Sequence, residues 1–387
     1  MLGEVFVHSA RDHDPRQAAG LFERVAALDA DNLAYVDLPF TYGLLGELEK
    51  AHELVRRTEA RQPAVAREQE AFLFALEGRP EEALRLPATT NPIFRQMRLM
   101  IALQASRWDL AREIASRDPG RGSLRAWGLR GRADLHAYLG EFDAAAAAYE
   151  EAGGTVGYRP DEQLTRGGVP ATALEALADL LQLKGDFPRA LQEAERSLGI
   201  QPESPRAQFF AGLAAVRASN LPVAEKRLDA LQKLVQRARA TTGDLYRDAL
   251  DAEIRLARGA APDAVSLLER VMRSDRVWQD MWSCGCTSGA VFREGLARAY
   301  LAIGDRDKAA TTLRPLVSGS FEGWAHPVVS VRALYTLGKL SVEGGDVAPG
   351  REYLKRFLAQ WGKAGWDLPE VREARRLLAQ PGNGASS

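Results

Sequence analysis

Apolar residues recur at three- and four-residue spacing along most of this chain, which is the pattern of amphipathic α-helices. Leu174, Leu177 and Leu181 form one such stripe, and Ala190 and Leu198 belong to a second stripe that follows a short Lys-Gly-Asp turn. Glycine supplies a backbone that can reverse direction there. The pattern therefore predicts a pair of helices joined by a tight turn.

This helix–turn–helix unit repeats along the chain. Nine short turns are each followed, five residues later, by a small residue, which is alanine in eight of the nine. The position seven residues before each turn is Ala or Gly in seven units, so small residues stand where the two helices of a pair must approach closely. Units that cannot bury their own apolar face stack on their neighbours, so the repeat predicts an all-α superhelical solenoid. The turns lie at Gly46, Gly78, Ser106, Gly140, Gly185, Ser219, Gly259, Gly304 and Gly345.

The two ends of the array differ from its middle. We expect residues 1–29 to form a degenerate or partial N-terminal repeat, residues 30–366 the superhelix, residues 367–379 a capping helix and residues 380–387 a disordered tail. The sequence Asp-Leu-Pro-Glu at 367–370 predicts that Asp367 is the N-cap of the last helix, with an acidic residue three positions later.

The charge of the chain changes the range of partners that we expect. Lys plus Arg number 51 against 52 for Asp plus Glu, so the net charge is −1 and no bulk field attracts nucleic acid or an anionic membrane. The sequence has no apolar run of signal-peptide or membrane-spanning length. Its two cysteines fit a reducing compartment. We therefore expect a soluble, cytoplasmic protein with no nucleic-acid or membrane partner.

Residues that could carry chemistry are few. The common phosphate-binding, acyl-transfer and zinc-protease motifs are absent from the sequence. Cys284 and Cys286 are a candidate metal or redox pair, but a structural zinc site needs four ligands, and we interpret them as two loop cysteines. We expect no catalytic residues, no metal, no cofactor and no small-molecule substrate. An enzyme with its site on the insertion at 274–289 stays as a weaker alternative.

The small residue of the first helix, the turn, the alanine of the second helix and the frequent proline after it resemble the tetratricopeptide repeat (TPR) family. The resemblance covers roughly residues 30–360. It implies a right-handed α-solenoid of about nine to ten repeats with a C-terminal capping helix. In that family the first helices of the repeats line a concave groove. The resemblance therefore implies a non-catalytic scaffold that binds a protein or peptide segment in this groove.

The family's register also indicates which side chains would face the groove. They stand thirteen, ten or six residues before each turn, and their number includes the aromatic and Arg residues that commonly dominate interfaces. The groove becomes more basic toward its C-terminal end, which predicts that acidic or mixed-charge segments bind near Arg298, Arg332 and Lys339. The candidate groove residues are Trp127, Arg130, Glu175, Asp179, Arg206, Phe209, Tyr246, Glu253, Arg298, Arg332, Tyr335 and Lys339.

A second resemblance concerns the C-terminal part, from Gly304 to Leu378, which includes ARAYLAIGDRDKAATTL and REYLKRFLAQWGKAGWDLPEVREARRLL. This part is similar to the TPR region of bacterial serine/threonine kinases and of related signalling regulators. The kinase motifs themselves, a glycine-rich loop, His-Arg-Asp and Asp-Phe-Gly, have no counterpart in the chain. The resemblance implies an alternative function, that of a sensory or regulatory module detached from its catalytic domain.

Overall fold

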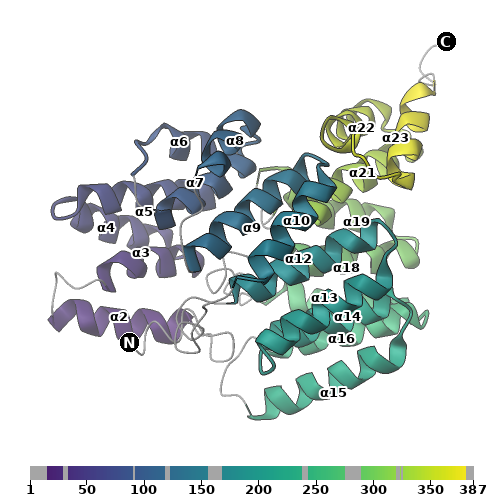
Figure 1. Ribbon diagram of the computed structural model, residues 1–387, viewed down its shortest axis with the longest axis horizontal. Helices are drawn as coiled ribbons and strands as arrows, with labels where there is room; N and C mark the ends of the chain where they lie inside the picture. The colour runs from purple at the N-terminus through teal and green to yellow at the C-terminus, as the bar shows by residue number, and fades with distance from the viewer. Residues whose placement is uncertain are drawn as a thin grey trace.

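The computed structural model shows a chain of helix pairs, and within the described ranges it contains no β-strand (Figure 1). It describes residues 15–28, 34–89, 92–117, 123–155, 168–237, 243–274, 289–319, 323 and 326–380. Its elements are α2 (Pro15–Leu28), α3 (Ala34–Leu44), α4 (Leu48–Glu59), α5 (Pro63–Leu76), α6 (Pro80–Arg85), α7 (Pro92–Gln104), α8 (Trp108–Ser116), α9 (Ser123–Tyr138), α10 (Phe142–Gly153), α12 (Val169–Leu183), α13 (Phe187–Ile200), α14 (Pro205–Arg217), α15 (Leu221–Arg237), α16 (Gly243–Ala257), α17 (Ala261–Met272), α18 (Gly289–Ala302), α19 (Arg306–Leu313), the 3₁₀ segment η2 (Arg314–Val317), α21 (Pro327–Glu343), α22 (Val347–Trp361) and α23 (Pro369–Ala379).

All nine predicted turns are confirmed by their backbone conformation. Seven are glycines with φ between +72° and +90°, and Ser106 and Ser219 adopt the same left-handed region at φ of +56° and +58°. The eight alanines that follow the turns are at most 1% exposed. At the ninth position, a Cβ on Gly350 would lie 2.9 Å from the carbonyl oxygen of Gly338. Small residues at these sites therefore allow the two helices of each pair to pack closely.

The two serine turns give a stability prediction. A residue with a Cβ is strained in the left-handed region, whereas glycine is not. Ser219 is exposed at its turn, so Ser219→Gly should raise the free energy of unfolding by about 0.5–1 kcal/mol in urea denaturation. Ser219→Ala keeps a Cβ at the same φ and should give no gain. Equal stability of the two variants would contradict this explanation of the turn.

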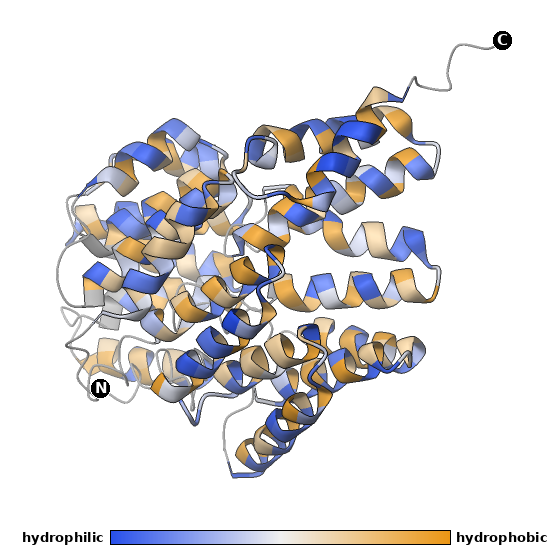
Figure 2. Cartoon of the chain, turned by 45° about the vertical axis from the view of Figure 1, so that its right-hand side comes forward, coloured by the Kyte–Doolittle hydropathy of each residue, from blue (hydrophilic) through white to orange (hydrophobic). Residues whose placement is uncertain are grey.

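Successive helices pack on one another in chain order, and the first helices of neighbouring pairs also touch, as α12 does with α14. Figure 2 shows apolar and polar residues on different sides of the helices, as expected where one side of each helix packs on its neighbours. These contacts confirm the predicted all-α solenoid of TPR-like helix pairs. No helix in the described ranges combines the length and the apolar character that crossing a bilayer requires.

The helix predicted at the C-terminus is present as α23, but its predicted N-cap is wrong. The N-cap residue is Leu368, which has an extended backbone (φ −96°, ψ 125°) and makes no side-chain capping bond. Proline restricts the preceding residue to this region, so Pro369 fixes the boundary one residue later than expected. Asp367 pairs instead with Arg372. Cys284, Cys286 and the tail from 381 lie outside the described residues.

Candidate binding face and its closing seam

The first helices of the last six repeat units form a closed ring. These helices are α9, α12, α14, α16, α18 and α21, and each contacts the next. The last of them, α21, also contacts the first, α9. Figure 1 shows this return as the C-terminal helices lying beside α9 and α10. Most buried apolar residues of α21 to α23 accordingly join the same hydrophobic cluster as those of α9 and α10, whereas Val329, Ala333 and Leu337 of α21 pack in the cluster of α14 to α18. Six units therefore complete one superhelical turn.

Helices α21 and α22, together with the residues that flank them in sequence, contact the α9–α10 pair. We call this contact the seam. Trp361 is fully buried there, and its indole Nε1 donates a hydrogen bond of 2.9 Å to the carbonyl oxygen of Ala137. Its ring meets Phe142 edge-on, with centroids 5.1 Å apart. Trp366 packs on the same phenylalanine at 4.9 Å and donates through Nε1 to Asp143. Two tryptophans from the end of the array therefore hold it to the middle.

The turn at Gly140 is built into the seam. A Cβ at this position would lie 3.1 Å from the carbonyl oxygen of Gln360 and 3.3 Å from the Cβ of Ala364. A Cβ at the equivalent turn Gly185 would meet nothing within 4 Å, although its φ of +77° is nearly the same as the +72° of Gly140. Glycine therefore favours both the turn and the close approach of the C-terminal unit at this position, and a Cβ there would move its neighbours by only a few tenths of an ångström.

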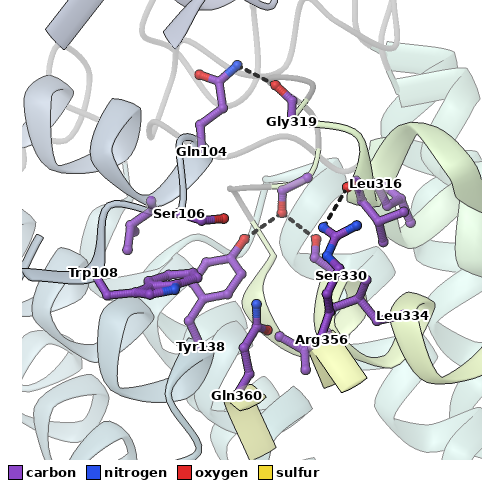
Figure 3. A pocket seen from close by; sticks show the side chains of 14 residues that line it. Gln104, Ser106, Trp108, Tyr138, Leu316, Gly319, Ser330, Leu334, Arg356 and Gln360 are labelled. Carbon is purple, nitrogen blue, oxygen red and sulfur yellow. Dashed lines mark hydrogen bonds between the residues drawn. The ribbon is translucent and has the colours of Figure 1, made fainter. Parts of the chain in front are cut away.

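A cavity of about 60 Å³ lies in the seam between α7, α8, α9, η2, α21 and α22 (Figure 3). The hydroxyl of Tyr138 donates to the carbonyl oxygen of Gly323 at 2.7 Å, and the side-chain nitrogen of Gln104 donates to that of Gly319 at 2.7 Å. The side-chain oxygens of Gln104 and Gln360 have no hydrogen-bond partner among the described protein atoms. A cavity of this size has room for a few water molecules, which would satisfy both oxygens.

Closure of the ring turns the predicted groove residues inward. Seven of the twelve are at most 7% exposed: Arg130, Glu175, Asp179, Arg206, Phe209, Tyr246 and Glu253. The other five are half-buried: Trp127, Arg298, Arg332, Tyr335 and Lys339. The structure therefore leaves only part of the predicted set within reach of a partner. Their role in binding stays a prediction.

The buried charges of the inner face pair with one another between neighbouring helices. Arg206 Nε donates to Glu175 at 2.9 Å, and Ser197 donates to the other oxygen of the same carboxylate at 3.2 Å. Arg130 binds Asp134 on its own helix at 3.0 Å and reaches Thr172 of α12 at 2.9 Å. Buried ions need such partners, since an unpaired buried charge is costly. The pairs therefore stabilise this arrangement of helices.

Arg217 connects three helices of the ring, and the repeat register did not identify it. Its Nη1 donates to Asp179 of α12 at 2.9 Å and its Nη2 donates to Glu294 of α18 at 3.0 Å. Glu294 also pairs with Arg332 of α21. Arg217 lies two residues before the turn at Ser219, outside the three register positions used for the prediction. The available signal was a single charged residue at the end of the apolar run FFAGLAAV.

The basic end of the groove is compensated by carboxylates. Arg298 Nη2 lies 2.6 Å from Glu253, and Arg332 pairs with Glu294. Lys339, the third predicted cation, is 3.9 Å from carboxylate oxygens of both Glu343 and Glu373. The excess positive charge expected from the sequence is therefore largely matched within the molecule.

Among the buried aromatic residues, Phe209, Tyr246 and Phe292 form a triangle on the inner face. Their ring centroids are 5.4 to 5.7 Å apart. Edge-on and tilted contacts at these distances add to the apolar burial of the rings. Phe209 and Tyr246 are therefore held in the core of the ring, and neither presents an open surface to a partner.

The ionisation of Glu294 makes the stability of the ring depend on pH. Burial raises the pKa of this carboxyl, but the charges of Arg332, Arg217 and Arg298 outweigh it and lower the pKa to about 2. A carboxyl whose pKa is lower in the folded than in the unfolded protein stabilises the fold at pH values above the unfolded-state pKa. This contribution is lost as the pH falls from there through the folded-state pKa. The free-energy advantage of wild type over Glu294→Gln should therefore shrink by about 2 kcal/mol between pH 5 and pH 3. Urea denaturation at both values measures it, and an unchanged difference would contradict the ion-pair assignment.

The chain is thus an all-α solenoid of TPR-like helix pairs with a ring closed by its last helix pair, α21 and α22. No family model matches the sequence, and no curated protein matches it. Among solved structures, it is similar to a TPR protein from Parabacteroides merdae, at 14% identity and a TM-score of 0.39 over 80% of this chain and 100% of that one. It is also similar to yeast Tom70, at 12% identity and a TM-score of 0.37 over 97% and 94%. A third similar structure is human IFIT1 with m7Gppp-AAAA, at 15% identity and a TM-score of 0.41 over 94% and 76%. At these values the fold assignment rests on the helix packing of the chain itself.

Proposed function

We propose that the protein is a non-catalytic scaffold that binds a protein or peptide segment at the edge of its inner face. The observation that carries the proposal is that three predicted groove residues that hold no buried carboxylate remain partly accessible. Trp127 lies near the start of α9, and Tyr335 and Lys339 lie in the second half of α21, all half-buried. A surface that is already formed costs little ordering when a partner binds. The closed ring supplies such a surface.

The charges around Tyr335 favour a partner segment of mixed charge. Burial, together with the nearby carboxylates of Glu373, Glu370 and Glu343, raises the pKa of Tyr335 to about 12. Lys339 lies between two of these carboxylates. An aromatic side chain beside groups of both signs is typical of a binding edge.

The test combines Tyr335→Ala with Lys339→Glu and measures proteins recovered from host lysate by quantitative mass spectrometry. Recovery of a specific partner should fall at least about tenfold, since a partner loses an aromatic anchor and a charge. Lys226→Glu, on the exposed side of α15, is the matched control and should leave recovery unchanged. Arg298 and Arg332 are unsuitable for this test because they hold buried carboxylates. Equal recovery by the double variant and wild type would refute the edge as the binding site.

The absence of nucleic acid and of catalysis is part of the proposal. The inner face matches its arginines with carboxylates, so its buried acids are paired rather than free for acid–base work. Within the described ranges, no group of three His, Cys, Asp or Glu side chains is placed to hold a metal ion. Nuclease treatment of the lysate should therefore leave partner recovery unchanged.

A narrower proposal follows from the C-terminal resemblance, namely that the scaffold serves a bacterial kinase or transcription regulator as its sensory module. The partner recovered in the same experiment decides this. A kinase or a DNA-binding regulator lost from the Tyr335→Ala/Lys339→Glu sample would support it, and a partner of another class would exclude it.

A further inference from the structure

Five cationic side chains of α22, α23 and the segment between them have no carboxylate within ion-pair distance in the described ranges. One of them, Arg356, donates to the carbonyl oxygen of Val317 in η2. The other four are Arg351, Lys355, Lys363 and Arg375, and we call them the outer basic stripe. Arg351 and Lys355 stand four residues apart on one side of α22, about 6 Å along its axis, and Lys363 lies two residues beyond the end of the helix at Trp361. Arg375 joins them from α23, because its Nη2 donates to the carbonyl oxygen of Gly362 at 2.6 Å.

Backbone carbonyls hold the two arginines of the stripe in place. Arg351 Nη1 donates to the carbonyl oxygen of Gln380 at 3.2 Å, as Arg375 does to Gly362. A neutral carbonyl orients a guanidinium but leaves its charge uncompensated and its other N–H donors available. Arg372, on the same helix as Arg375, is instead paired with Asp367. The two arginines of the stripe are therefore positive groups held in fixed positions.

The charge of this region differs from that of the whole chain. Residues 347–380 contain seven Lys or Arg and four Asp or Glu, whereas the chain as a whole has a net charge of −1. The acidic residue nearest to the stripe in sequence is Glu352, which is exposed on α22 three residues before Lys355 and forms no ion pair with it. Most other exposed arginines of the described ranges have a carboxylate partner, as Arg189 has in Glu150. The positive charge is thus concentrated on the outer side of the last unit.

We propose that the outer basic stripe docks an acidic helical segment of a partner protein whose carboxylates recur every four residues. The proposal rests on the scaffold function and adds a second contact surface, outside the ring. Carboxylates at that spacing lie on one side of a helix and match the spacing of Arg351 and Lys355. Single-stranded nucleic acid would need aromatic rings on which bases stack. The nearest tryptophan, Trp366, is occupied by its contacts with Phe142 and Asp143.

The probe is a labelled synthetic helical peptide of about 20 residues with Glu at every fourth position, titrated with the full chain and read by fluorescence anisotropy at low salt. Arg351→Glu/Lys355→Glu should weaken binding at least about tenfold, since attraction becomes repulsion. Lys226→Glu/Lys233→Glu on α15 makes the same change in net charge away from the stripe and should alter affinity less than about twofold. Added salt should weaken wild-type binding, because the contacts are exposed.

Three results would overturn the proposal. The first is equal weakening by both charge-reversed pairs, which would mean that only net charge matters. The second is equal affinity for a peptide of the same composition with its Glu residues clustered at one end. The third is tighter binding of an RNA oligonucleotide of equal charge or of phosphatidylserine vesicles, which would assign the stripe to those ligands.

The Tyr335→Ala/Lys339→Glu variant should bind the acidic peptide as wild type does. If the acidic peptide does not bind the stripe, the partner-recovery test of the inner edge still stands. If the inner edge does not bind a partner, the peptide-binding result for the stripe still stands.

Discussion

Trp361→Ala should lower the free energy of unfolding by about 4 kcal/mol and open the ring at its seam. The indole is fully buried, so its removal leaves a large cavity, and its hydrogen bond to Ala137 is lost. The edge-on contact with Phe142 is lost as well. Urea denaturation measures the stability, and hydrogen exchange of residues 137–143 reports whether α9 and α10 have lost their cover.

Phe357→Ala is the matched control for this prediction. Phe357 is on the same helix and equally buried, and its ring contacts Tyr335 and Trp361 within the C-terminal units. We expect a similar loss of stability, about 3–5 kcal/mol, with a smaller rise in exchange at 137–143. The same rise in both variants would mean that Trp361 stabilises its own unit and has no special role in closing the ring.

Arg217→Met should lower the free energy of unfolding by about 3–5 kcal/mol. The substitution keeps a long apolar side chain but leaves Asp179 without its partner and Glu294 with one partner fewer, both buried. The pKa of Glu294 should rise from its value of about 2, because one of the charges that lower it is gone. Denaturant unfolding gives the stability, and its pH dependence gives the direction of the pKa change.

Two comparisons separate this effect from a general loss of charge. Arg189→Met breaks an exposed pair with Glu150, in which both side chains are largely solvated, and should cost less than about 1 kcal/mol. Arg217→Met combined with Glu294→Gln should cost less than the sum of the single substitutions, because the two residues share one interaction. Strict additivity would contradict the cross-ring pair.

The sequence predicted the helix pairs well because their rules are local. A left-handed turn needs Gly or tolerates Ser, and the residue five positions later must be small for the helices to approach. All nine turns follow these rules, down to Ser219. The N-cap of the last helix was misplaced because Pro369 constrains the residue before it more strongly than Asp367 favours a cap.

The closure of the ring could not be predicted from the sequence. Gly140 and Gly185 occur in the same sequence context of a turn, and only the tertiary structure places Gln360 and Ala364 against the first of them. The number of units per superhelical turn depends on small rotations between units, which residue spacing does not encode. The register could not show which of its residues are buried, because a charged residue such as Glu175 gives no sequence signal of burial.

The measurement that tests the closed ring most directly is disulfide formation between Gly140→Cys and Ala364→Cys, with Cys284 and Cys286 replaced by Ser. A Cβ at Gly140 lies 3.3 Å from the Cβ of Ala364, close to the ~3.8 Å separation typical of disulfides. We expect mild oxidation to link the two positions in most molecules, as detected by mass spectrometry of the digested protein. The pair Gly185→Cys and Ala364→Cys should stay unlinked. An absence of linkage in both pairs would show that the superhelix is open in solution and that its inner face is accessible.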